Sequence, residues 1–210
     1  FDLLRTTILP ELADRCRRAN RALRIWSAAT STGQEAFSIS MLLADLQVQL
    51  AGVRAEIVAT DYATHVLNRA RRGTFTQIEV QRGLPERYLR QYFVQTPDGY
   101  RIGDDIRKRV AFREINLLES FRSLGQFDVI LCRNVLIYFD TPTKKDVLDR
   151  LAGALAPGGY LFLGATESAY GLTDRLTRLS SVPTSLHMRS EDVSQPGSQL
   201  RMPSVAAVVG

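Results

Sequence analysis

Short runs of consecutive apolar residues alternate along this chain with longer segments in which apolar residues recur every three or four positions. The continuous runs are typical of strands buried on both faces, and they are RIWSAA (24–29), AEIVATD (55–61), FDVILCR (127–133) and PGGYLFLGA (157–165). The longer segments have the spacing of amphipathic helices, and they are residues 3–22, 34–52, 63–73 and 142–155. Strands and helices in alternation predict an α/β fold with a mostly parallel sheet covered by helices on both faces.

Two stretches interrupt this alternation. Within residues 81–109, Pro97-Asp98-Gly99 joins two short β-prone runs, which is typical of a hairpin. We expect a small antiparallel β-subdomain here, inserted before a further strand at 110–116. Residues 190–210 are rich in Ser, Gly and Pro and predict a disordered tail or linker. Residues 1–23 then form a linker helix that enters a main domain at 24–189.

Length and composition narrow the class of protein. A chain of 210 residues with 45% hydrophobic and 23% charged residues suits one globular domain with a small insertion. No apolar run reaches the roughly 18 residues that a membrane span needs, so we expect no membrane insertion. The two cysteines lie far apart, which predicts no disulfide framework and fits the reducing cytoplasm. The two histidines are isolated in sequence, so no metal site is expected.

The net charge of +5 favours an acidic partner. Basic residues concentrate at 16–24 and 68–72. Aromatic residues are not interleaved with them, as a stacking surface for bases would require. We therefore interpret both clusters as solvated helix faces and expect no nucleic-acid partner.

Candidate chemistry gathers where the predicted strands end, because ligands of open parallel sheets bind beyond the carboxyl ends of the strands. After the first strand, small residues including Thr32 and Gly33 form a turn that leads into a helix, where a backbone can approach a ligand closely. Glu35 lies in the first turn of that helix, either as a simple partner of the helix dipole or facing a cationic ligand. The turn lacks the G-x-G-x-x-G pattern, which argues against a dinucleotide.

Polar residues also end the other strands. Asp61 either binds both hydroxyls of a ribose or caps the following helix. Asn116 and Leu117 would suit the edge and face of an adenine. Arg133 and Asn134 follow a buried strand, where a polar pair needs partners that a pocket would supply. Tyr138, four residues on, is either a core aromatic residue or part of that pocket.

These segments, taken in order, resemble one family. The strings RIWSAATSTGQEAFSISMLL, IVATDYATHVLNRARRGTF, INLLE, FDVILCRNVLIYFD and LAPGGYLFLGATES are similar to the chemotaxis-receptor glutamate methyltransferases, the CheR family, over about residues 1–189. The resemblance implies the Rossmann-like fold of class I S-adenosylmethionine (SAM)-dependent methyltransferases. It also implies methyl transfer from SAM to receptor glutamates, with S-adenosylhomocysteine (SAH) as the product.

Roles for individual residues follow from this resemblance. The positions that would contact SAM are Thr32, Gly33, Glu35, Asp61, Asn116, Leu117, Asn134 and Val135. Tyr138 would stand near the transferred methyl, and Arg133 would either guide the acceptor carboxylate or form an outward salt bridge. The partner would be a methyl-accepting chemotaxis receptor, held at 81–109 in some members by a tethering peptide added to a strand edge. The enzyme would act as a monomer in the cytoplasm, preceded by a helical domain that supplies one wall of the pocket.

Several departures keep an alternative open. The family usually has Cys at Thr30, Glu at Gln34, Pro at Ala36, Tyr at Phe37, and His-Ser at 165–166. A non-catalytic module that only binds SAM or docks to a receptor is therefore the main rival to an active enzyme. A nucleic-acid methyltransferase would usually show Asn-Pro-Pro-aromatic or Pro-Cys after the fourth strand, and residues 133–136 show neither.

Overall fold

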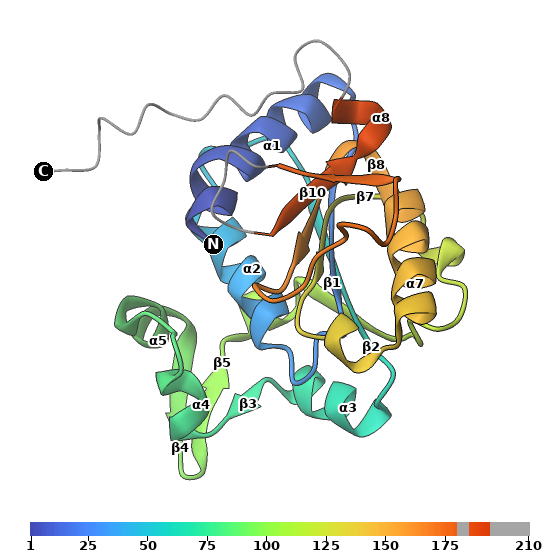
Figure 1. The fold of residues 1–210 in the computed structure, drawn as a ribbon. Helices are drawn as coiled ribbons and strands as arrows, with labels where there is room; N and C mark the ends of the chain where they lie inside the picture. The colour runs from blue at the N-terminus through green and yellow to red at the C-terminus, as the bar shows by residue number, and fades with distance from the viewer. Residues whose placement is uncertain (180–184, 194–210) are drawn as a thin grey trace, which may run out of the picture.

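The computed structural model describes residues 1–179 and 185–193. Its centre is a seven-stranded sheet (Figure 1). The strand order is β6 (Val110–Glu114), β2 (Ala55–Asp61), β1 (Leu23–Ala28), β7 (Phe127–Cys132), β8 (Leu155–Leu163), β10 (Leu186–Arg189) and β9 (Leu176–Arg178). The first five strands in this order run parallel to one another. β10 and β9 are antiparallel. The mostly parallel α/β sheet predicted from the apolar runs is confirmed.

Helices cover both faces of the sheet, as Figure 1 shows. One face packs against the N-terminal segment, formed by η1 (Leu4–Ile8) and α1 (Leu9–Arg18), and against α2 (Gln34–Asp45). The other face packs against α7 (Thr141–Ala154) and the loop around η2 (Arg122–Leu124). β7 is buried at all six positions because it lies in the middle of the sheet between these two layers. α3 (Thr64–Arg72) lies against β2 and β6 and ends at Gly73, in the left-handed conformation.

The inserted β-subdomain is a three-stranded sheet beside the main domain (Figure 1). Its strand order is β3 (Thr74–Phe75), β5 (Gly99–Ile102) and β4 (Phe93–Thr96), all antiparallel. The predicted hairpin at Pro97-Asp98-Gly99 joins β4 to β5 and is confirmed. Three short helices complete the insertion, and they are α4 (Gln77–Gln81), α5 (Glu86–Tyr92) and α6 (Asp104–Arg107). The antiparallel sheet begins at Thr74, before the predicted boundary at residue 81.

Asp45, at the carboxyl end of α2, ties the β-subdomain to the main domain. Its Oδ2 accepts hydrogen bonds from the Tyr88 hydroxyl at 2.6 Å and from Arg87 at 3.2 Å, and its Oδ1 accepts one from the Tyr92 hydroxyl at 2.8 Å. Arg5 of η1 reaches the same carboxylate at 3.3 Å. The two tyrosines and Arg87 belong to α5, so one carboxylate joins α2, α5 and the N-terminal segment.

Several sequence expectations need correction. The helix predicted over 34–52 ends at Asp45 and is followed by turns, while β9 and β10 had no clear signal. Residues 190–193 form α8 (Ser190–Val193), so the predicted tail begins with a helix. The remainder of that tail, 194–210, lies outside the described residues. Every helix within 1–179 and 185–193 is too short or too polar to cross a membrane.

Candidate functional site

The loop after β1 bends sharply at the carboxyl edge of the sheet. Ala29 and Ser31 both have φ of +53°, and Gly33 has φ of +90°. A left-handed backbone strains residues that carry a Cβ, so this loop is held by its surroundings. A Cβ on Gly33 would lie 3.1 Å from both the Ala70 Cβ and the Phe37 ring. Glycine is therefore required where the loop presses against α3 before α2 begins.

Asp61, at the end of β2, holds this loop in place. Its Oδ2 accepts the Ser31 N–H at 2.9 Å, and its Oδ1 accepts the Ala63 N–H at 3.0 Å. The second bond closes a local turn before α3, whose N-cap is Ala63 and receives no side-chain cap. The interpretation of Asp61 as the cap of the following helix is therefore wrong. Each carboxylate oxygen retains acceptor capacity, and the half-buried side chain remains available to ligand hydroxyls.

Glu35 lies in the first turn of α2 with its carboxylate directed at the ends of β1 and β7. Its Oε1 accepts the Ser27 hydroxyl at 2.8 Å, and its Oε2 pairs with Arg133 at 3.3 Å. The side chain is only 19% exposed. Burial raises the pKa of Glu35, and the Ser27 hydroxyl and the Arg133 charge oppose that shift. The carboxylate thus lies in the first turn of α2, and its cationic partner is the guanidinium of Arg133.

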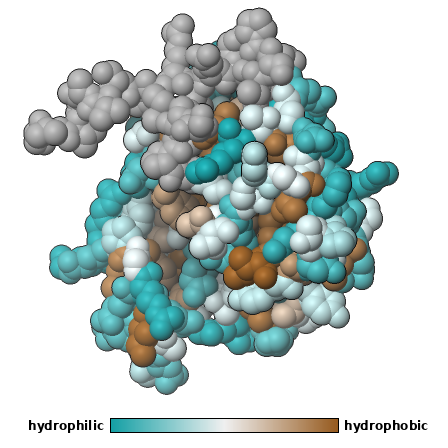
Figure 2. Space-filling model, in the orientation of Figure 1, coloured by the Kyte–Doolittle hydropathy of each residue, from teal (hydrophilic) through white to brown (hydrophobic). Residues whose placement is uncertain are grey.

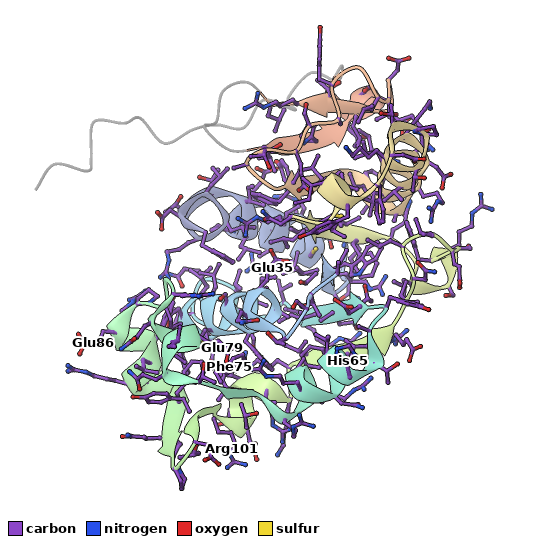
Figure 3. All side chains as sticks on the ribbon, turned by 60° about the horizontal axis from the view of Figure 1, so that its bottom comes forward. Glu35, His65, Phe75, Glu79, Glu86 and Arg101 are labelled. Carbon is purple, nitrogen blue, oxygen red and sulfur yellow. The ribbon has the colours of Figure 1, made fainter. Side chains whose placement is uncertain are left out.

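A cavity of about 700 Å³ lies between α2, the N-terminal segment and the β-subdomain. Glu35 on α2 and Arg133 in the loop after β7 line it, and Phe75 and Glu79 line it from the β-subdomain. Figure 3 labels Glu35, Phe75 and Glu79. Figure 2 shows this hollow with apolar side chains gathered inside it. Asp61, Asn116 and Asn134 are not among its lining residues. The structure thus brings all the predicted residues to the carboxyl edge of the sheet but only part of them to this cavity.

Residues after β6 divide between surface and core. The Oδ1 of Asn116 accepts the Leu118 N–H at 3.0 Å, and its Nδ2 donates to Glu119 at 3.3 Å. Leu117 is buried among the core residues on the α7 face. Asn116 therefore offers the remaining amide hydrogen and lone pairs to a ligand, while the side chain of Leu117 packs inward.

The loop after β7 carries the remaining predicted residues. Asn134 has φ of +61°, and Val135 leads into η3 (Leu136–Tyr138). Tyr138 is 80% exposed, which excludes the interpretation as a core aromatic residue. Arg133 is exposed and forms a salt bridge with Glu35 at 3.3 Å.

Glu167 was missed by the sequence argument. It is buried, and its carboxylate accepts main-chain N–H groups from the loops after β7 and β8. The signal that identified Asp61, an acid just beyond the carboxyl end of a buried strand, was present here too. Within the described residues, no cluster of three or more His, Cys, Asp and Glu could hold a metal ion.

Comparisons with known proteins identify the family of the chain. The family described as CheR methyltransferase, SAM binding domain, matches residues 1–184. Chemotaxis protein methyltransferase 1 of Pseudomonas aeruginosa is 43% identical over 187 residues, which cover 87% of this chain and 68% of that protein. The chemotaxis protein methyltransferase of Escherichia coli is 39% identical over 173 residues, covering 80% of this chain and 60% of that protein.

Solved structures match at lower similarity. The glycopeptide N-methyltransferase MtfA, complexed with sinefungin, is 16% identical with a TM-score of 0.44, covering 85% of this chain and 56% of that one. The present chain spans about two thirds of the length of the curated relatives described above. The family match over residues 1–184 and the 43% identity to a chemotaxis protein methyltransferase show that the chain belongs to the CheR methyltransferases and contains their SAM-binding domain.

Proposed function

We propose that this chain transfers the methyl group of SAM to glutamate side chains of chemotaxis receptors in the cytoplasm, forming methyl esters. The relatives are chemotaxis protein methyltransferases by name, which supports a receptor substrate. The observation that carries the proposal is the inward carboxylate of Glu35, which lines a large cavity at the carboxyl edge of the sheet.

The residues at this edge fit SAM. The Glu35 carboxylate is suited to the ammonium group of the methionyl part, and the Asp61 carboxylate to the two ribose hydroxyls. Asn116 and the main chain of Leu117 would meet the adenine. Thr32 and Gly33 would let the backbone approach the ligand, and Asn134 and Val135 would contact it from the loop after β7.

Methyl transfer to a carboxylate acceptor needs no general base from the protein. When bound, SAM supplies an electrophilic methyl on sulfur, and its C–S electron pair remains with SAH as the new O–CH₃ bond forms. A glutamate acceptor has an ordinary pKa of about 4.3 and is already ionised at neutral pH, so no residue must remove a proton. The protein has to orient the acceptor oxygen and exclude water, and orientation alone can supply roughly 7–11 kcal/mol.

Two residues are placed to serve the acceptor. The side chain of Arg133 is 41% exposed while it pairs with Glu35, so its guanidinium can also face a carboxylate arriving from solvent. Tyr138 extends into solvent from the same loop, where it would border the transferred methyl. Both assignments predict effects on turnover rather than on folding.

The β-subdomain would dock the receptor. β4 is the edge strand of the order β3-β5-β4, and its residue Val94 is exposed. An unpaired edge can accept an extended peptide as a further strand. A receptor tethering peptide would then keep the enzyme close to its substrate, with the enzyme acting as a monomer.

The test is methyl transfer from radiolabelled SAM to the cytoplasmic helical fragment of a receptor. Glutamate methyl esters release methanol in base, whereas methylated amines do not, so base-labile label is the expected result. Binding of SAH together with no base-labile label would instead support the non-catalytic SAM-binding module. The same reaction with receptor glutamates replaced by alanine is the control for acceptor identity.

A further inference from the structure

One buried carboxylate connects the two loops that follow β7 and β8. The Oε1 of Glu167 accepts the N–H groups of Val135 and Leu136 at 2.9 and 2.8 Å. Its Oε2 accepts those of Asn134 and Gly164 at 2.8 and 2.6 Å. Glu167 is only 6% exposed. Four main-chain donors thus converge on a single side chain that solvent barely reaches.

The arrangement suits a carboxylate and no other side chain of this size. An ionised carboxylate has acceptors only, with two lone pairs on each oxygen, and here both oxygens receive two N–H groups. A glutamine in the same place would turn an NH₂ group toward two N–H donors. The contact would become repulsive, and buried N–H donors would be left without an acceptor.

The loop that Glu167 holds is strained. Asn134 has φ of +61°, a left-handed conformation that residues with a Cβ adopt rarely, asparagine more often than most. Such conformations persist only when the surroundings enforce them. The bond from the Asn134 N–H to Glu167 acts directly on the strained residue, and the next two N–H groups are fixed by the same carboxylate.

The loop after β8 is closely fitted around this carboxylate. A Cβ on Gly164 would lie 2.5 Å from Oε2 of Glu167 and 3.0 Å from the Asn134 nitrogen, so only glycine fits there. The carbonyl of Glu167 accepts the Ser185 hydroxyl at 2.9 Å, which ties the same residue to the segment before β10. Glu167 is therefore held on both its main chain and its side chain.

We propose that Glu167 is a positioning residue for methyl transfer, which sets the conformation of residues 134–138 and so places Asn134 and Tyr138 at the cofactor. This inference rests on the proposed function, because it assigns the loop after β7 to SAM. Glu167 acts through main-chain groups of the loop. Its removal should disturb the site before it disturbs the sheet.

The variants are Glu167→Gln and Glu167→Asp, with Glu191→Gln as a matched control. Glu191 is a largely exposed glutamate that pairs with Arg189 on the surface. We expect Glu167→Gln to weaken SAH binding at least tenfold by calorimetry. We expect Glu167→Asp, which retains both acceptor oxygens on a shorter side chain, to bind SAH more tightly than Glu167→Gln. Glu191→Gln should leave the affinity unchanged.

Hydrogen exchange separates positioning from a general structural role. Amides of residues 134–136 and 164 should exchange faster in Glu167→Gln, while those of α7 and β1 keep their protection. Faster exchange throughout the chain, or SAH affinity within twofold of the unchanged protein, would overturn the proposal. An aspartate variant that binds no better than the glutamine variant would also contradict it.

A second variant covers the case in which Glu167→Gln does not fold. Gly164→Ala places a methyl group against Oε2 of Glu167 and the Asn134 nitrogen while leaving the carboxylate in the chain. It should weaken SAH binding by a similar factor and loosen the same amides, and unchanged binding would contradict the proposal. Since SAH binding needs no receptor, these results stand even if receptor methylation by the unchanged protein fails.

Discussion

The Nη1 atom of Arg133 lies 3.3 Å from Oε2 of Glu35 and joins the loop after β7 to the first turn of α2. Ser27 at the end of β1 donates to the other oxygen of the same carboxylate. The half-buried carboxylate of Glu35 is thus supported by the end of the neighbouring strand β1 and by a loop about a hundred residues away in sequence. This placement makes Glu35 the group at the site whose protonation should matter most for cofactor binding.

The first prediction concerns the pH dependence of SAH affinity. Only ionised Glu35 attracts the SAH ammonium, and burial raises the pKa of this carboxyl. Affinity should therefore fall on acidification at a pH above the ordinary glutamate range. Calorimetry at several pH values checks this, and Glu35→Gln should bind SAH weakly with most of that dependence gone. A glutamine variant that retains the full pH dependence would contradict the assignment.

Protonation of Glu35 should weaken SAH binding but stabilise the folded protein without ligand. A pKa raised in the folded state means that the folded protein binds the proton more readily than the unfolded chain. The resulting stabilisation is complete below the ordinary value of 4.5 and is lost as the pH rises through the raised value. Without ligand, acidification through that window should stabilise the unchanged protein relative to Glu35→Gln in urea unfolding.

The second prediction concerns the ribose site. Asp61→Ala removes the acceptor for two ligand hydroxyls and also releases the Ser31 N–H. SAH should bind at least tenfold more weakly by calorimetry. Asp14→Ala is the matched control, since Asp14 is an exposed aspartate that pairs with Arg17 on α1. Equal affinity for the Asp61 variant and the unchanged protein would remove ribose binding from this residue.

The third prediction concerns Tyr138, whose side chain is exposed beside the site. Tyr138→Phe removes only the hydroxyl, so turnover with a receptor fragment should fall more than SAH affinity. Its melting temperature should stay within about a degree of the unchanged protein, because the ring contributes little to the core. The control is Tyr170→Phe, because Tyr170 is a still more exposed tyrosine in the loop after β8, and this change should leave turnover unchanged. Parallel losses of turnover and affinity would indicate a role in binding.

The sequence was most informative where one local signal decides the structure. Mostly apolar runs identified β1, β2 and β7, because strands buried on both faces are rich in apolar residues along their length. The few buried polar residues in them, such as Thr60 and Asp128, are satisfied by hydrogen bonds. The residues Pro97-Asp98-Gly99 located the hairpin because these residue types favour a tight turn between two strands. Ends of parallel strands then located Glu35 and Asp61, since topology alone brings those ends to one edge.

Features that depend on distant partners could not be predicted in this way. The position of Glu167 just beyond the end of β8 marks it as a candidate, but its sequence neighbours do not show that three N–H groups of residues 134–136 will converge on it. The sequence suggested that the Leu117 side chain faces a ligand. Its burial against the α7 face of the sheet could not be predicted, because it depends on residues that are distant in sequence. Helices α4 and α5 were missed because they are short and are held by contacts such as that between Tyr88 and Asp45.

The last prediction concerns acid stability and a histidine outside the site. His187 in β10 is buried, and burial, followed by the nearby charge of Arg178, lowers its pKa to about 4. The unfolded chain, with an ordinary value of 6.5, binds more protons between these limits. The contribution of neutral His187 to the free energy of unfolding is therefore fully present above pH 6.5. It is lost as the pH falls from 6.5 through 4, by up to about 3 kcal/mol. His187→Leu should flatten the urea-unfolding free energy between pH 7.5 and 4.5, whereas His65→Leu, at an exposed position on α3 (Figure 3), should not. An unchanged slope in the His187 variant would place the acid sensitivity on other groups.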